Sequence, residues 1–142
     1  MNTVRCANCG KPNRTPDAAK GVPRCGNCHE PLPWIANADD GTFHETAERA
    51  GLPVLVDFWA QWCGPCRSVT PVLEQLAGEM AGRVKLVKVD VDTSPALSQR
   101  FQITAVPTLM VLHEGRVVAQ RAGGAPPAQL RQWVEDSVRA PS

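Results

Sequence analysis

The sequence has 142 residues, enough for one compact domain and a small additional segment. With 43% apolar residues, 20% charged residues and a net charge of +1, it gives no general indication of a nucleic-acid or membrane partner. No stretch approaches the roughly 20 apolar residues of a membrane-spanning helix, and the first residues contain no apolar run typical of an export signal. We therefore expect a cytoplasmic protein whose six cysteines serve metal binding or redox chemistry.

The first part of the chain, residues 1–34, is predicted to form a small zinc ribbon. Cys6 and Cys9 form one Cys-x-x-Cys pair, and Cys25 and Cys28 form a second pair after fifteen intervening residues. Four thiolates at this spacing are typical of one structural Zn²⁺, with iron as the second candidate metal. Because the segment has too few apolar residues for a core, the metal would supply most of its stability. Two disulfides or reduced free thiols are the alternative.

The segment from Cys25 to His29 also matches Cys-x-x-Cys-His, the pattern of covalent haem attachment. We reject haem because it would leave Cys6 and Cys9 without a role and because this attachment normally requires export. No organic cofactor is expected. Five basic and two acidic residues precede residue 34, so with four thiolates and one Zn²⁺ the segment carries about +1, which is too little to favour nucleic acid.

The remainder, residues 35–142, is predicted to be an α/β domain, a central mixed sheet flanked by helices. Residues 37–41 are expected to form a loop. Helical and strand patterns then alternate along the chain. The expected elements are a helix over 43–50, a strand over 54–59, a helix after Cys66 with Pro71 inside it, a strand over 84–91, a helix over 94–100, a hairpin of 108–112 with 116–120, and a helix around 130–138.

The third Cys-x-x-Cys pair, Cys63 and Cys66, lies between the strand over 54–59 and the following helix. Unpaired N–H groups and the positive end of the peptide dipoles at a helix N-terminus favour a thiolate over a thiol. This placement makes Cys63 a nucleophile near neutral pH. Two buried structural cysteines or half of a metal site are the alternatives.

Residues 58–66, Phe-Trp-Ala-Gln-Trp-Cys-Gly-Pro-Cys, together with Val-Pro-Thr at 106–108, closely resemble the thioredoxin family over about residues 40–140. With the cysteine-rich first segment, nearly the whole chain resembles the zinc-ribbon-bearing thioredoxin 2 class. The resemblance implies a thioredoxin fold in which Pro107 follows a cis peptide bond and faces the two thiols. Cis X-Pro bonds are uncommon and usually have a purpose.

The resemblance also implies the reaction, the reduction of protein disulfides. Cys63 attacks a disulfide in a partner protein, and Cys66 then resolves the mixed disulfide. Asp57, a carboxylate in an otherwise apolar strand, is the candidate proton acceptor, since desolvation would raise its pKa. The alternative is a partly exposed strand-end aspartate paired with a lysine. By resemblance, Lys88 would be the charge that modulates Asp57.

A docking surface for protein substrates is implied around the thiols, with Trp62 exposed at its centre and Trp59 packed in the core. Gly124 fits the last position of this surface as well as Gly123 does. The docking residues are Trp62, Gly64, Pro65, Val106, Pro107, Ala122 and Gly123.

The Gly-Pro dipeptide between the thiols indicates an electron donor, since thioredoxins have potentials of about −270 mV against about −180 mV for isomerases. The resemblance further implies regeneration by an NADPH-dependent thioredoxin reductase, and we expect the protein to act as a monomer. Two other hypotheses compete with a general reductase. The ribbon could recruit a macromolecule that the redox domain serves locally, or the chain could be an oxidase or isomerase.

Overall fold

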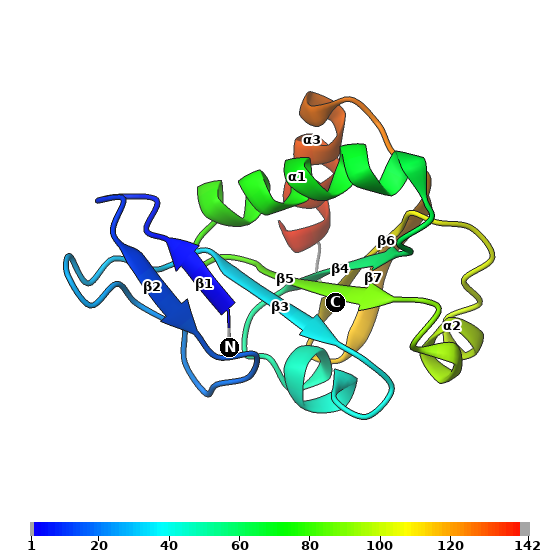
Figure 1. Cartoon of the computed structure of the whole chain (residues 1–142), viewed down its shortest axis with the longest axis horizontal. Helices are drawn as coiled ribbons and strands as arrows, with labels where there is room; N and C mark the ends of the chain where they lie inside the picture. Colours follow the sequence, from blue (N-terminus) through cyan, green and yellow to red (C-terminus); the bar gives the residue numbers. More distant parts are fainter. Residues whose placement is uncertain (1, 140–142) are drawn as a thin grey trace.

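A five-stranded mixed sheet forms the centre of the fold (Figure 1) in the computed structural model, which describes residues 2–139. Its order is β3-β5-β4-β6-β7; β3, β5 and β4 are parallel, and β6 and β7 continue the sheet antiparallel. The strands are β3 (Trp34–Ala38), β4 (Val54–Trp59), β5 (Lys85–Asp90), β6 (Thr108–His113) and β7 (Arg116–Ala122).

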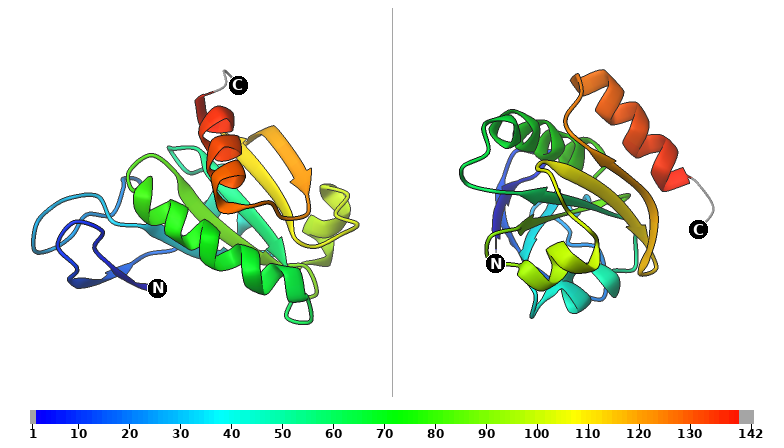
Figure 2. Two further views of the ribbon diagram at one scale, coloured as in Figure 1. Left: turned by 90° about the horizontal axis from the view of Figure 1, so that it is seen from above. Right: turned by 90° about the vertical axis from the view of Figure 1, so that its right-hand side faces the viewer.

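Helices cover both faces of this sheet (Figure 2). On one face lie α1 (Gly64–Glu79) and α3 (Pro127–Arg139), which bury one set of strand side chains that includes Leu55. On the other lie the π-helical turn η1 (His44–Glu48) and α2 (Pro95–Arg100), which bury the alternate set. The prediction of an α/β domain with the thioredoxin fold is therefore confirmed. No helix within residues 2–139 is both long and apolar enough to span a membrane.

The cysteine-rich segment forms a separate two-stranded sheet of β1 (Asn2–Arg5) and β2 (Pro12–Thr15). It lies beside the β3 edge of the large sheet (Figure 1), where the Asn2 side chain donates to the Ile35 carbonyl at 2.8 Å. The indole of Trp34 donates in return to the Pro16 carbonyl at 2.8 Å. The outer bounds of the two predicted domains, residues 1 and 142, lie outside the described residues.

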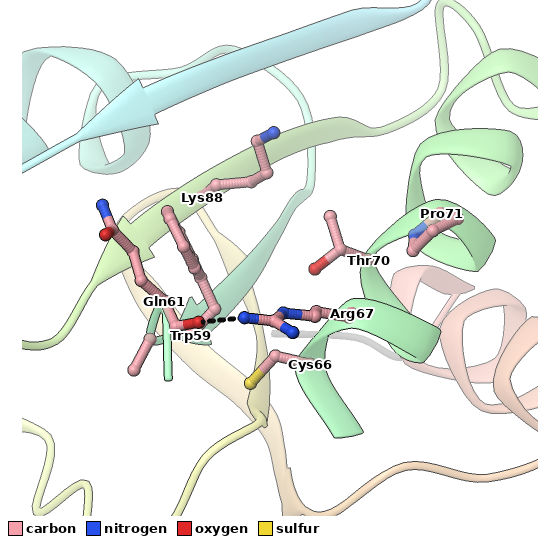
Figure 3. A pocket seen from close by; sticks show the side chains of 8 residues that line it. Trp59, Gln61, Cys66, Arg67, Thr70, Pro71 and Lys88 are labelled. Carbon is pink, nitrogen blue, oxygen red and sulfur yellow. Dashed lines mark hydrogen bonds between the residues drawn. The ribbon is translucent and has the colours of Figure 1, made fainter. Parts of the chain in front are cut away.

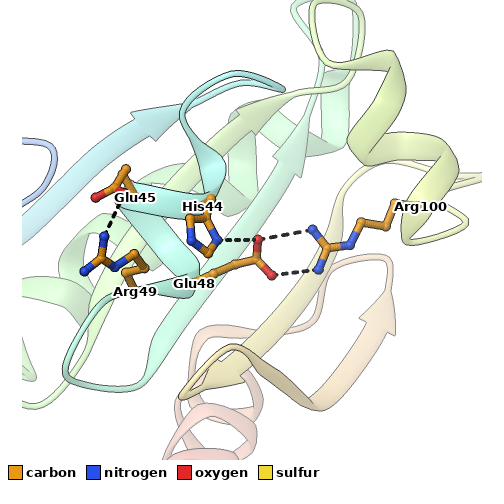
Figure 4. Close-up of polar contacts among 5 residues, drawn as sticks. All are labelled: His44, Glu45, Glu48, Arg49 and Arg100. Carbon is orange, nitrogen blue, oxygen red and sulfur yellow. Dashed lines mark hydrogen bonds and ion pairs between the residues drawn. The ribbon is translucent and has the colours of Figure 1, made fainter.

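One local prediction was wrong, and another was confirmed only in part. The loop expected over 37–41 begins later, because β3 continues through Ala38 in parallel register with β5. The helix expected over 43–50 is reduced to η1. This turn is connected to α2 by the Glu48 carboxylate, which pairs with Arg100 at 2.7 Å and lies 3.5 Å from His44 (Figure 4). The Arg100 guanidinium lowers the pKa of Glu48.

Candidate redox site and metal-binding site

Cys63 and Cys66 are joined as a disulfide at the junction of β4 and α1. Cys63 is the N-cap of α1, and its sulfur accepts the backbone N–H of Cys66 at 3.1 Å. The two side chains are 3% and 2% exposed, so burial does not distinguish them in the oxidised state. The helix N-terminus distinguishes the two cysteines, because the Cys66 N–H points at the Cys63 sulfur and stabilises a thiolate on Cys63 after reduction.

Pro107 and Gly123 lie on the loops that meet beside Cys63. The Val106–Pro107 peptide bond is cis, and the Cys63 sulfur lies 3.6 Å from the Val106 carbonyl oxygen. Gly123 has a φ of +82° and donates its N–H to the Pro107 carbonyl at 2.8 Å. Gly124 is required for a different reason, since a Cβ there would lie 2.6 Å from the Val69 side chain on α1.

Trp62 is 68% exposed next to the disulfide. Its indole N–H donates to the Asp92 carboxylate at 2.8 Å, a contact that no sequence pattern indicated because Asp92 follows a different strand. Around it, Gly64, Pro65 and Ala122 are exposed and Val106 is half-buried. Trp59, in contrast, is partly buried against the cluster of Ala60, Cys63 and Cys66.

Asp57 is fully buried in β4. Its Oδ2 accepts a hydrogen bond from the Thr70 hydroxyl at 2.9 Å, whereas its Oδ1 has no hydrogen-bond partner among the described residues. Burial raises the pKa of Asp57 to about 6, against the opposing effects of Thr70 and of the Lys88 charge. A group with this pKa can accept and release protons near neutral pH.

Lys88 is the register partner of Asp57 on β5, and its ammonium lies 3.3 Å from the Glu74 carboxylate of α1. The lysine charge is therefore close to Asp57 but paired with another residue. Sequence reasoning missed Thr70 and Glu74, although both follow Cys66 at helical spacing of four and eight residues.

A cavity of about 400 Å³ opens between α1 and the ends of β4 and β5 (Figure 3). The Cys66 sulfur and the Thr70 hydroxyl project into it from α1 on the side of Trp59, and Arg67 donates to the Gln61 carbonyl at 3.1 Å. The lining residues are Trp59, Ala60, Gln61, Cys66, Arg67, Thr70, Pro71 and Lys88.

The four cysteines of the first segment form a second cluster, with all Sγ atoms within 4.8 Å of one another. The Sγ atoms of Cys6 and Cys28 lie 3.5 Å apart, and those of Cys9 and Cys25 lie 3.6 Å apart. A tetrahedral zinc ion with bonds of about 2.3 Å places its sulfurs about 3.8 Å apart. The cluster therefore fits one tetrahedral metal ion.

Hydrogen-bond donors around the Cys25 sulfur favour the thiolate state that a metal requires, whereas the pKa of Cys6 is raised because the backbone N–H of Cys9 is outweighed by burial and the neighbouring sulfurs. The Asn13 amide donates to Cys25 at 3.4 Å, and the backbone N–H of Asn27 donates to the same sulfur at 3.4 Å. The pKa of Cys25 is lowered to about 6, principally because the Cys28 N–H also points at its sulfur. The Asn27 amide donates to Cys9 at 3.6 Å.

The two sites lie at opposite ends of α1. The redox pair is at its N-terminus, whereas the ribbon lies beside its C-terminal end (Figure 1). There a Cβ atom added to Gly82, which follows the helix, would lie 3.0 Å from the Pro31 side chain of the ribbon. A helix of 16 residues is about 24 Å long, so the cluster of four cysteines has no direct contact with the disulfide.

The α/β domain matches the family described as Thioredoxin over residues 34–136. Thioredoxin C-2 of Corynebacterium nephridii is 42% identical over 104 residues, 73% of this chain and 96% of the relative. Thioredoxin of Haemophilus influenzae is 38% identical over 104 residues, 73% of this chain and 97% of the relative.

A third relative matches along nearly the whole chain. Thioredoxin C-3 of Corynebacterium nephridii is 35% identical over 140 residues, 96% of this chain and 95% of the relative. Such a match cannot be confined to the α/β domain, so it extends over the segment that holds Cys6, Cys9, Cys25 and Cys28.

Proposed function

The chain belongs to the thioredoxin family of thiol–disulfide oxidoreductases, and from this premise we propose that it is a general reductant of disulfides in other proteins. The observation that carries this proposal is the redox pair itself. Cys63 and Cys66 are joined at the N-terminus of α1, with the Cys63 sulfur in the N-cap position.

The reaction is a two-electron exchange in which a substrate disulfide is reduced and the Cys63–Cys66 dithiol is oxidised. The Cys63 thiolate attacks one substrate sulfur, the substrate S–S bond breaks, and the departing sulfur takes a proton. Cys66 then loses its proton and attacks Cys63, which forms the Cys63–Cys66 bond and breaks the mixed disulfide. The second substrate sulfur leaves and is protonated in turn.

The second attack needs a group that takes the Cys66 proton, and Asp57 is proposed for that role. Its support is complete burial, a pKa near 6 and an Oδ1 without a partner among the described residues. Lys88 would act as a nearby positive charge that opposes the rise in this pKa. Pro107 would border the substrate segment opposite the thiols.

The docking surface around the disulfide is proposed to bind extended segments of partner proteins. Its members are Trp62, Gly64, Pro65, Val106, Pro107, Ala122 and Gly123. The dithiol must be regenerated by a reductase, and we propose an NADPH-dependent thioredoxin reductase. We further propose that the protein acts as a monomer in the cytoplasm, where thiols are kept reduced.

We propose that the ion held by Cys6, Cys9, Cys25 and Cys28 is one structural Zn²⁺, as in the zinc-ribbon-bearing thioredoxin 2 class. Zinc suits four thiolates in a closed tetrahedral site, and it has no redox chemistry of its own. The ribbon would end and the redox domain begin near residue 34, where β3 starts.

Trapping the mixed disulfide tests the proposed function. A Cys66→Ser variant mixed with a disulfide-bonded protein such as insulin should accumulate one covalent adduct that dithiothreitol releases. A Cys63→Ser variant should form none, and the unsubstituted protein, in which Cys66 resolves the adduct, serves as the control. Adducts in Cys63→Ser, or none in Cys66→Ser, would contradict the assigned order of attack.

A further inference from the structure

The Thr70 hydroxyl contacts the proposed proton acceptor but has no role in the reaction described above. It lies on α1 one turn after Cys66 and donates to Asp57 Oδ2 at 2.9 Å. Both Cys66 and Thr70 line the cavity of about 400 Å³, and Figure 3 shows their polar atoms on the same side of α1. The hydroxyl therefore connects the buried carboxylate to the helix that bears the resolving thiol.

The two oxygens of Asp57 differ because of this contact. Oδ2 is held by Thr70, whereas Oδ1 has no partner among the described residues. Buried polar atoms are nearly always hydrogen-bonded, and an exception calls for a reason. An oxygen that must receive a proton during the reaction is such a reason, because a permanent donor at that oxygen would compete with the proton.

The charged groups that face Asp57 come from two elements and none of them occupies Oδ1. From α1 this is Glu74, and from β5 it is Lys88, whose ammonium pairs with Glu74 at 3.3 Å. On β6 the residue opposite Asp57 is the apolar Leu109. Within residues 2–139, Thr70 is thus the one side chain that donates a hydrogen bond to the carboxylate.

We propose that Thr70 is a positioning residue, whose hydroxyl fixes Asp57 Oδ2 and presents Oδ1 as the oxygen that takes the proton from the Cys66 thiol. The inference rests on the proposed role of Asp57 as proton acceptor. In this step the S–H bond of Cys66 breaks and an O–H bond forms at Oδ1. The electron pair left on Cys66 then makes the bond to Cys63, and the substrate sulfur departs with its own pair.

The hydroxyl also sets the pH at which the step works. A donor to the carboxylate favours the ionised form, so Thr70→Val, which keeps the side-chain shape and removes the donor, should raise the pKa of Asp57 by about one unit. At pH 7 less of the carboxylate would then be ionised. We expect the resolution of a preformed mixed disulfide at pH 6 to slow by about three- to tenfold, with a smaller loss above pH 8.

The experiment measures single-turnover resolution against pH in the full chain, with the carboxyl ¹³C resonance of Asp57 followed in parallel. Thr70→Ser should keep the midpoint of the rate profile and the titration of the Asp57 carboxyl at their values in the unsubstituted protein. Ser68→Ala, on the exposed side of the same helix, should also change neither. Thr70→Ala provides a second removal of the hydroxyl should the valine disturb packing. A midpoint and a titration unchanged in both variants would overturn the inference.

The Asp57→Asn variant separates this inference from the proposed function. If Asp57→Asn leaves the pH profile intact, Asp57 is not the proton acceptor, and both proposals fall together. If Asp57→Asn removes the ionisation from the profile but Thr70→Val does not move it, only the role of Thr70 is refuted. The double variant should resolve no more slowly than Asp57→Asn alone, since Thr70 is proposed to act only through the carboxylate.

Discussion

The Lys85 ammonium lies 4.0 Å from the centroid of the Trp34 ring, beneath the ribbon and almost completely buried. It donates to the carbonyl of Asp17 at 2.5 Å and to that of Thr46 at 2.6 Å. Burial lowers its pKa to about 8. One side chain of the central sheet thus connects the ribbon on one side with the segment of η1 on the other.

Replacing Lys85 with methionine should destabilise the protein by about 2 kcal/mol. Methionine keeps the apolar length of the side chain but leaves two buried carbonyl groups without their donor. The free energy of urea unfolding, measured on the oxidised protein, tests this. Lys20→Met is the matched control, since Lys20 is exposed and its replacement should change stability by less than about 0.5 kcal/mol. Equal effects of the two substitutions would contradict the role of Lys85.

Asp57→Asn should stabilise the folded protein at neutral pH. The pKa of Asp57 is about 6 in the fold, whereas an unperturbed aspartate has a pKa of 3.8. Between these values the folded state holds a proton that the unfolded state has lost, so stability falls as pH rises from 4 to 6 and stays reduced above. The asparagine removes this effect and should gain about 3 kcal/mol at pH 7.5 but little at pH 4.

Urea unfolding at the two pH values measures this gain. The control is Glu114→Gln, which replaces an exposed carboxylate in the hairpin turn. Because the variant and the parent protein are compared at the same pH, any change in the metal site contributes equally to both. A gain of the same size at pH 4 and pH 7.5 would mean that it does not come from the ionisation of Asp57.

The redox pair could be predicted from sequence because its signals are local. An apolar strand, the two thiols and a helix follow one another within residues 54–79, and the resemblance added the partner loop at Pro107. The end of β3, in contrast, depends on a distant part of the chain. β3 is a strand as far as Ala38 because β5 offers it a parallel edge, which its own sequence does not indicate.

Lys85 and Thr70 could not be identified for related reasons. The alternation over 84–91 indicated charged side chains opposite the apolar ones, but the ribbon covers the face to which Lys85 points. The spacing of Cys66, Thr70 and Glu74 indicates a common face of a helix. It does not reveal which strand residue lies opposite, and the carboxylate of Asp57 is what gives the Thr70 hydroxyl its importance.

Metal removal should unfold the ribbon and leave the redox domain intact. We expect one Zn²⁺ per chain by elemental analysis, retained in Cys66→Ser and lost in Cys9→Ser. After chelation, the amides of β1 and β2 should exchange hydrogen rapidly, because the segment has little apolar burial beyond Leu32 and the cysteines. Amides of β4 should remain protected. A protected β1–β2 hairpin in metal-free protein would contradict the structural role of the ion.

Trp62→Ala should weaken docking of protein substrates without changing the chemistry of the thiols. The indole is 68% exposed and held by Asp92, so it presents an apolar face to a partner at little entropic cost. Loss of one aromatic contact of this kind should raise KM for a disulfide-bonded protein by about tenfold.

Val117→Ala alters the other large exposed apolar side chain among residues 2–139, 48% exposed on β7, and should leave KM unchanged. A small aromatic disulfide reagent makes few contacts with the surface, so its reduction rate should be the same in all three proteins. An equal loss with that reagent would place the effect of Trp62 on thiol reactivity instead of docking.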